Sequence, residues 1–290
     1  MTALNRTTFF AYARNAPFGG RLTQGQVENM NIILDLWEGE FKDGPQGDPR
    51  WLAYYLASVF HETSAWMAPV REGTNSRRQA TDAQAIAAAK QVYDKGYTKI
   101  RYFDVGRYGF VPYGRGPIQV TLDDNYAYVA AKISEAVEDV PALLLSKDKG
   151  HEIAMYGTYA GWWTRGKHRP GRYFNMTTED PEGARRIVNG KDKAKLIAGY
   201  YYNFKGALDA ALEEKTPADV KESDAEPDDK KATESNPVIA AFATFSAGGS
   251  GLAALGALDN PYALAAFALI LIAGGIGLYL IKSGRVSFNK

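Results

Sequence analysis

The chain has 290 residues, enough for one substantial globular domain and a smaller segment. Its 34 Lys and Arg residues nearly balance its 33 Asp and Glu residues, so no strong electric field attracts it to nucleic acid. It contains no cysteine and only 3 histidines, which excludes disulfides, thiolate nucleophiles and cysteine-ligated zinc. We therefore expect no metal, no cofactor and no nucleic-acid partner.

Residues 1–213 have the composition of a helix-rich globular domain. The segment at residues 1–20 lacks the basic stretch followed by an apolar run that a secretory signal requires. Apolar residues then recur at helical spacing, as in Val27, Met30, Ile33 and Leu34. Helices are expected over residues 24–41, 51–61, 83–92, 126–138, 151–163, 181–188 and 192–212. Residues 95–121 are rich in Gly, Tyr and Arg and should form a loop or short strands.

After residue 213 the composition changes twice, first to a charged segment and then to uncharged apolar runs. Residues 214–236 hold almost no apolar side chains, and we expect a disordered charged linker. Residues 262–281 contain no charged side chain, which predicts a transmembrane helix. Residues 237–258 form a second uncharged run rich in Ala, Gly and Ser, which fits either a second helix of a membrane hairpin or a flexible apolar loop. One span would place the N-terminal domain outside the cytoplasm, whereas a hairpin would leave both termini inside.

The sequence His61-Glu62-Thr63 ends one of the apolar helical stretches. A glutamic acid in apolar surroundings is a candidate for remaining protonated near neutral pH, and it can then donate a proton to a leaving oxygen. A zinc-protease motif would need a second histidine at position 65, which is Ala65. Taken alone, such a dipeptide more often caps a helix or forms a salt bridge.

Further blocks give this dipeptide a context. They are YGRGPIQVT at residues 113–121, followed by Asn125-Tyr126, then AGWW at residues 160–163 and ARRIVNG at residues 184–190. In this order they resemble the family 19 glycoside hydrolases, over about residues 20–212 of this chain. The resemblance implies a mainly α, lysozyme-like bilobal domain with a catalytic cleft.

The resemblance also implies roles for single residues. Glu62 would be the general acid, and Thr121 and Asn125 would hold or polarise the attacking water. The candidate substrate-binding residues are His61, Tyr113, Arg115, Gln119 and Asn189. An alternative for Arg115 is an ion pair with a carboxylate of the cleft. Gly114, Gly116 and Pro117 are interpreted as a tight turn without a chemical role.

An inverting glycosidase needs a second carboxylate as base. We assign this role to Glu72, ten residues after the acid, as in the phage and bacterial lysozyme-like members of the family. Plant-type chitinases place this residue further along a longer loop. Asp82 and Asp104 are the rival candidates, and Arg71 beside Glu72 would help to keep that carboxylate ionised.

The expected substrate is peptidoglycan, with chitin as the alternative, because both polymers contain β-1,4-linked N-acetylglucosamine. Absent cysteines and a candidate membrane segment favour a phage or bacterial wall hydrolase anchored in the inner membrane, with its catalytic domain acting in the periplasm or on the wall. Two other hypotheses remain open at this point. One is a non-catalytic wall-binding module on a membrane anchor, and the other is a protein whose apolar tail perforates membranes.

Overall fold

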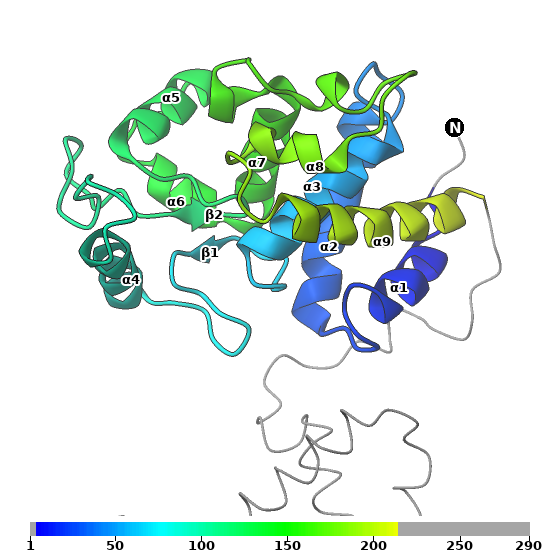
Figure 1. Cartoon of the computed structure of the whole chain (residues 1–290), viewed down its shortest axis with the longest axis horizontal. Coiled ribbons are helices and arrows are strands. Elements are labelled where there is room, and N and C mark those ends of the chain that lie inside the picture. The colour runs from blue at the N-terminus through cyan, green and yellow to red at the C-terminus, as the bar shows by residue number, and fades with distance from the viewer. Residues whose placement is uncertain (1–3, 214–290) are drawn as a thin grey trace, which may run out of the picture. The chain divides into compact units, whose positions relative to one another are not determined.

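The computed structural model describes residues 4–213, and these residues fold as a mainly helical unit with one two-stranded sheet (Figure 1). The linker and apolar segments expected over residues 214–236, 237–258 and 262–281 lie outside the described residues. Within residues 4–213, no helix is both long enough and apolar enough to cross a bilayer.

The α-helices are α1 (Arg6–Asn15), α2 (Gln24–Leu36), α3 (Pro49–Glu62), α4 (Asp82–Asp94), α5 (Asp123–Ile133), α6 (Val140–Leu145), α7 (Lys147–Ala160), α8 (Pro181–Ala184) and α9 (Ala194–Leu212). Shorter elements are a π-helical turn η1 (Trp37–Phe41) and the 3₁₀ turns η2 (Trp162–Thr164), η3 (Pro170–Arg172) and η4 (Arg185–Ile187). The strands are β1 (Val70–Arg71) and β2 (Arg115–Gly116).

Every helix expected from periodicity is present, but several of them end elsewhere. The helix expected over 24–41 becomes a π-helical turn after Leu36, and that expected over 181–188 becomes a 3₁₀ turn after Ala184. The helix expected over 126–138 ends at Ile133, because Ser134 takes the left-handed conformation (φ 58°). The sequence analysis did not expect α1 or α6, and α6 is too short for a periodic apolar pattern to be visible.

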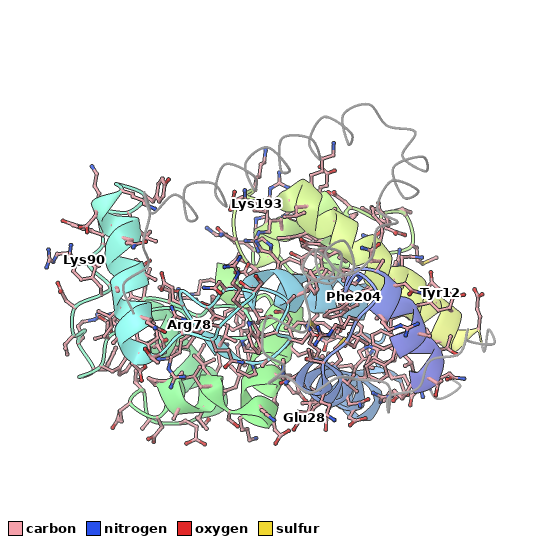
Figure 2. The ribbon with its side chains drawn as sticks, turned by 90° about the horizontal axis from the view of Figure 1, so that it is seen from below. Tyr12, Glu28, Arg78, Lys90, Lys193 and Phe204 are labelled. Atoms are coloured by element: carbon pink, nitrogen blue, oxygen red, sulfur yellow. The ribbon has the colours of Figure 1, made fainter. Side chains whose placement is uncertain are left out.

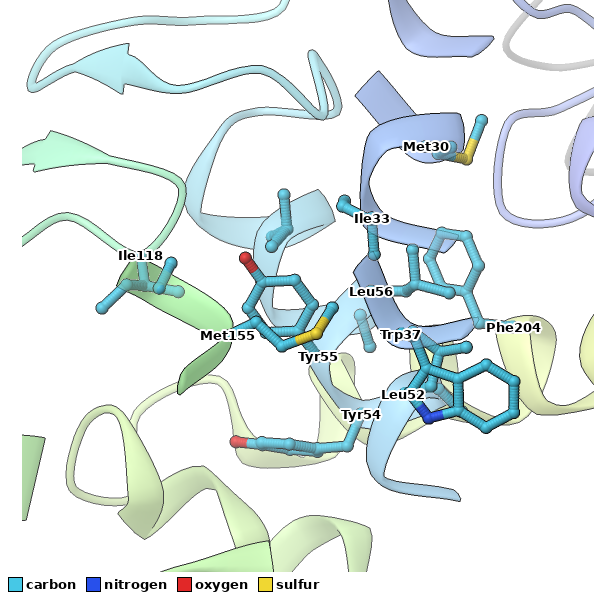
Figure 3. Packing of buried hydrophobic residues seen from close by; sticks show 14 of the residues in the cluster. Met30, Ile33, Trp37, Leu52, Tyr54, Tyr55, Leu56, Ile118, Met155 and Phe204 are labelled. Atoms are coloured by element: carbon cyan, nitrogen blue, oxygen red, sulfur yellow. The ribbon is translucent and has the colours of Figure 1, made fainter. Parts of the chain in front are cut away.

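Helix α3 is the centre of the fold. It begins at Pro49 after Asp48, whose carboxylate accepts a hydrogen bond from the Arg50 N–H at 2.9 Å. Residues 52–59 are all buried, so the helix has packed neighbours on every side. Helix α9 packs along it, and Leu56 lies near Phe204 of α9 in the core (Figure 3). This buried helix carries Glu62 as its last residue.

The described residues contain two separate clusters of buried apolar side chains. The main cluster surrounds α3 and includes side chains from α1, α2, α7 and α9. The smaller cluster is formed by Ala85, Ala89, Tyr102, Phe103 and Tyr113. Figures 1 and 2 both place α4, which contributes to the smaller cluster, at the opposite end of this unit from α1. We refer to these two groups as the main cluster and the α4 cluster.

A tight reversal follows α3. The Thr63 hydroxyl donates to the Val59 carbonyl at 2.7 Å and accepts from the Met67 N–H at 3.0 Å, so this buried side chain closes the helix end. Ser64, Ala65 and Met67 all have positive φ angles, of 53°, 70° and 58°. Such conformations are unfavourable for residues with a side chain and persist only where neighbouring contacts enforce them.

The reversal leads into the β1–β2 pair. The strands are antiparallel, with Val70 opposite Gly116 and Arg71 opposite Arg115. One position further on, the Glu72 N–H donates to the Gly114 carbonyl at 2.7 Å. The register therefore fixes Glu72 beside Gly114, the second residue of the YGRGPIQVT block that the sequence analysis singled out.

A buried histidine lies behind this region, on α7. The His151 side chain is inaccessible to solvent; its Nε2 lies 3.3 Å from the Asn29 Oδ1, and its Nδ1 lies 3.4 Å from the Tyr55 hydroxyl. Burial lowers the pKa of His151 from 6.5 to about 3. The folded protein therefore holds this side chain in its neutral form.

We predict that His151 makes stability fall with acidification. Its pKa is lower in the folded state than in the unfolded state, so its contribution is complete above pH 6.5 and is lost as the pH falls from 6.5 towards 3. The free energy of unfolding should drop by about 1.4 kcal/mol per pH unit in this window. Urea denaturation between pH 7 and about 5, where few carboxylates titrate, should show this slope. The His151→Gln variant should have a flatter profile, and parallel profiles would contradict the assignment.

Candidate active site

Both carboxylates singled out in the sequence open onto one cavity. This cavity has a volume of about 250 Å³ and is lined by Glu62, Glu72, Gly114, Ile118, Gln119, Thr121, Val188 and Asn189. Its walls come from the end of α3, from the segments beside β1 and β2, and from the segment after η4. Of the predicted site residues, Glu62, Glu72, Thr121, Gln119 and Asn189 are thus brought together.

Glu62 is held by a buried cation. The Arg185 Nη1 lies 2.5 Å from the Glu62 Oε1, and the Arg185 side chain is only 2% exposed. The Arg185 Nε donates to the Asp192 carbonyl at 3.0 Å, which fixes the guanidinium from its other side. The sequence analysis expected apolar surroundings for Glu62, and the structure places a guanidinium there instead.

Glu72 is held by two neutral donors. The Tyr102 hydroxyl donates to its Oε1 and the Gly114 N–H donates to its Oε2, both at 2.8 Å. Burial raises the pKa of Glu72, and the two hydrogen bonds oppose this rise because they stabilise the ionised form. A carboxylate with a raised pKa and a fixed orientation suits proton acceptance near neutral pH.

Thr121 and Gln119 form the adjoining wall. The Thr121 hydroxyl donates to the Gln119 carbonyl at 2.9 Å. The Gln119 Nε2 donates to the Val70 carbonyl at 3.0 Å and to the Gly116 carbonyl at 2.9 Å. Gln119 itself has a positive φ of 58°. These bonds hold both side chains rigidly against the β1–β2 pair.

Asn125 does not line the cavity. Its Nδ2 donates to the Thr121 carbonyl at 2.8 Å, and its Oδ1 accepts from the Arg165 Nη2 at 3.0 Å. The side-chain amide therefore connects the first turn of α5 to Arg165. This placement supports the position of Thr121 and leaves no group of Asn125 on the cavity wall.

Arg115 and Tyr113 also lie behind the cavity. The Arg115 guanidinium lies 3.6 Å from the Tyr113 ring centroid and donates to the Tyr126 hydroxyl at 2.8 Å. Within residues 4–213 it forms no ion pair with a carboxylate, so the structure shows neither a cleft ion pair nor an open anion site. The Tyr113 side chain is buried, and its hydroxyl donates to Asp82.

The other substrate-binding candidates differ in position. Asn189 is exposed on the cavity wall, where its Oδ1 accepts from the Gly190 N–H at 2.8 Å. His61 is half-buried and does not line the cavity. Burial lowers the pKa of His61, which the charge of Glu62 partly offsets.

The rival bases are engaged in other contacts. Asp82 forms an ion pair with Arg71 at 3.0 Å and accepts from Tyr113, which together keep its pKa below the usual value. Asp104 pairs with Arg101 at 2.7 Å. Neither carboxylate lines the cavity. Arg71, which the sequence analysis placed beside Glu72 as its counterion, is thus the partner of Asp82.

Sequence reasoning missed two residues that hold the carboxylates, Arg185 and Tyr102. Arg185 lies within the ARRIVNG block, where an arginine beside a cleft motif was a visible signal. Tyr102 lies in the irregular segment 95–121, where several tyrosines are equivalent by sequence alone. Among residues 4–213, no group of three or more metal-binding side chains is arranged to hold a metal ion.

Comparisons with known proteins add no relative to this picture. No protein-family model matches the chain, and neither a curated protein nor a solved structure is significantly similar to it. The resemblance to family 19 therefore remains a prediction from the sequence motifs.

We predict that Tyr102→Phe raises the pKa of Glu72. The substitution removes a hydroxyl that stabilises the ionised carboxylate, while the ring can remain in the α4 cluster. Titration of the Glu72 carboxyl carbon by NMR in glutamate-labelled protein should show an upward shift. The control is Tyr97→Phe, because Tyr97 lies on the same segment and is 78% exposed. An unchanged Glu72 pKa in Tyr102→Phe would show that the hydrogen bond does not form.

Proposed function

We propose that this chain hydrolyses β-1,4 glycosidic bonds in peptidoglycan by an inverting acid–base mechanism and belongs to the lysozyme-like branch of family 19. The observation that carries the proposal is the single cavity that contains Glu62 and Glu72 together with Thr121 and Gln119. Glycoside hydrolysis typically requires two carboxyl groups on either side of the scissile bond, and here two carboxylates from different segments line the same cavity. The presence of two apolar clusters is compatible with the bilobal fold of such enzymes.

In the proposed reaction, Glu62 donates its proton to the glycosidic oxygen. The bond between this oxygen and the anomeric carbon breaks, and its electron pair stays on the leaving oxygen. A water molecule forms the new bond from the opposite face of the sugar, and Glu72 takes the proton that this water releases. The product anomer is therefore inverted.

The neighbours of the two carboxylates bear on these roles. Arg185 stabilises the negative charge that remains on Glu62 after proton donation, from a fixed position because it is buried. The same contact also favours ionised Glu62 before the reaction, so the acid role requires that substrate displace or weaken this ion pair. Burial makes Glu72 a stronger base than an exposed glutamate, while Tyr102 and Gly114 orient its oxygens. Asn189 on the opposite wall is available to hydrogen-bond an acetamido or hydroxyl group of the sugar.

Peptidoglycan is proposed over chitin on the composition of the whole chain. The absence of cysteine separates the chain from the disulfide-bonded plant-type chitinases. The uncharged run at residues 262–281 further suits an enzyme held at the bacterial inner membrane, close to the wall. Parallel assays on purified peptidoglycan and on chitin oligomers decide between the two polymers.

We predict that Glu62→Gln lowers the hydrolysis rate by about 10²–10⁴-fold, because the amide cannot donate the required proton. Release of soluble muropeptides from purified peptidoglycan by the full chain is the measurement. Glu138→Gln is the matched control, since Glu138 is exposed and lies outside the cavity. Near-wild-type activity of Glu62→Gln would refute the acid assignment. An inactive wild type that still binds peptidoglycan would favour the non-catalytic wall-binding module.

Chemical rescue tells acid from base. Added azide should partly restore Glu72→Ala, because a small anion can attack from the emptied site, whereas Glu62→Gln should be restored by substrates with a good aryl leaving group. The opposite pattern would assign Glu72 as acid and Glu62 as base.

A separate expectation concerns the membrane. If residues 262–281 span the bilayer, the full chain should sediment with membranes and need detergent for extraction. Substitution of two central residues, Leu269→Lys and Ile272→Lys, should release it, because charges at the bilayer centre are costly. A wild-type chain that stays soluble without detergent would refute the anchor, and a tail that alone depolarises vesicles would favour the perforation hypothesis.

A further inference from the structure

Gly114 lines the cavity, although the sequence analysis assigned it only to a turn. Its backbone is tied to Glu72 in both directions, since its carbonyl accepts from the Glu72 N–H at 2.7 Å and its N–H donates to the Glu72 Oε2 at 2.8 Å. Gly114 is not among the residues with positive φ, whereas the neighbouring Gly116 has a φ of 87°. Backbone conformation therefore explains glycine at position 116 and does not explain it at position 114.

The space in front of the Gly114 Cα is bounded by three side-chain oxygens. A Cβ added at this position would lie 2.9 Å from the Gln119 Oε1, 3.2 Å from the Thr121 Oγ1 and 3.4 Å from the Glu72 Oε2. These oxygens come from three different residues, all of which line the cavity. The missing side chain leaves open a small polar space at the proposed base.

All three oxygens are hydrogen-bond acceptors towards this space. The Gln119 Nε2 is used by two backbone carbonyls, so its Oε1 is the free end of the amide. The Thr121 hydroxyl donates its hydrogen to the Gln119 carbonyl and keeps its lone pairs. The Glu72 Oε2 is a carboxylate oxygen that already accepts from the Gly114 N–H.

A water molecule in this space can donate to two of the three oxygens, and Glu72 as the base together with the nearest oxygen, the Gln119 Oε1, are the two that fit the proposed reaction. It donates both of its hydrogens to the protein, and its oxygen lone pairs then face away from the acceptors. This is the orientation that a nucleophilic water needs, with one hydrogen on the base and a lone pair directed at the substrate. The arrangement at Gly114 thus fits an attacking water better than it fits a sugar hydroxyl, which has only one hydrogen to donate.

We propose that Gly114 is a positioning residue whose missing side chain keeps open the site of the attacking water, and that Glu72 and Gln119 accept the two hydrogens of this water while Thr121 lines the site. The inference rests on the proposed function and deepens it. Gln119 thereby takes the water-binding role that the sequence analysis gave to Asn125. The need for an open water site also explains why position 114 is a glycine.

The test is Gly114→Ala in the full chain. The added methyl group enters the water site, so kcat should fall by about 10²-fold or more, while KM and the binding of a non-hydrolysed oligosaccharide change little. The fold should persist, because the three nearest atoms are side-chain oxygens and not backbone atoms, although the Gln119 amide must shift slightly against its two hydrogen bonds. The matched control is Gly199→Ala, since a Cβ at Gly199 of α9 meets no atom within 4 Å. A Gly114→Ala enzyme with wild-type kcat would overturn the inference.

A second variant covers the case in which Gly114→Ala does not fold. Gln119→Ala should also lower kcat with little change in KM, whereas loss of a sugar contact would raise KM at constant kcat and overturn the inference. If both single variants fold, the double variant should be no slower than the slower single one, since both act on the same water. A wild type without hydrolytic activity refutes the proposed function itself, whereas an active wild type with an equally active Gly114→Ala refutes only the water site.

Discussion

A carboxyl group at the end of a helix whose central residues are all buried needs compensation, and much of the site is arranged around that requirement. Helix α3 is buried over residues 52–59, and the side chain of its last residue, Glu62, is only 16% exposed. Arg185 reaches Glu62 from a segment 123 residues later in the chain. The loss of one partner from a buried ion pair typically costs about 3–5 kcal/mol, because the other charge is left uncompensated. The ion pair therefore holds η4 against α3, and the Tyr54 hydroxyl adds a second link through the Ala184 carbonyl at 2.8 Å.

The second carboxylate depends on backbone geometry more than on charge. The reversal after α3 contains three non-glycine residues with positive φ, and it turns the chain directly into β1. Two residue pairs of antiparallel sheet then set the register that brings Glu72 beside Gly114. A shift of one residue in this register would turn Glu72 to the other face of the pair. The one sheet of residues 4–213, which has only two short strands, thus positions the proposed base.

The sequence predicted what depends on local pattern. The helical periodicity of α3 and α9 located both, and the irregular composition of residues 95–121 located the segment that contains β2. Contacts between distant segments were not accessible in this way. Tyr102 and Glu72 are 30 residues apart, and no periodic pattern links them. Asn125 is the opposite case, in which the motif predicted a role in the cavity that the side chain does not have. Its Oδ1 instead accepts a hydrogen bond from Arg165.

The attachment of the two carboxylates has a mechanical consequence. Glu62 is fixed to the main cluster through α3 and Arg185, whereas Glu72 is fixed through Tyr102 to the α4 cluster. Glu62 and Glu72 are therefore anchored to different apolar clusters of one compact unit, and the β1–β2 pair and the reversal before it connect the two segments. A change in the packing of one cluster against the other would therefore change the position of Glu62 relative to Glu72, so the geometry of the cavity depends on how these two clusters pack.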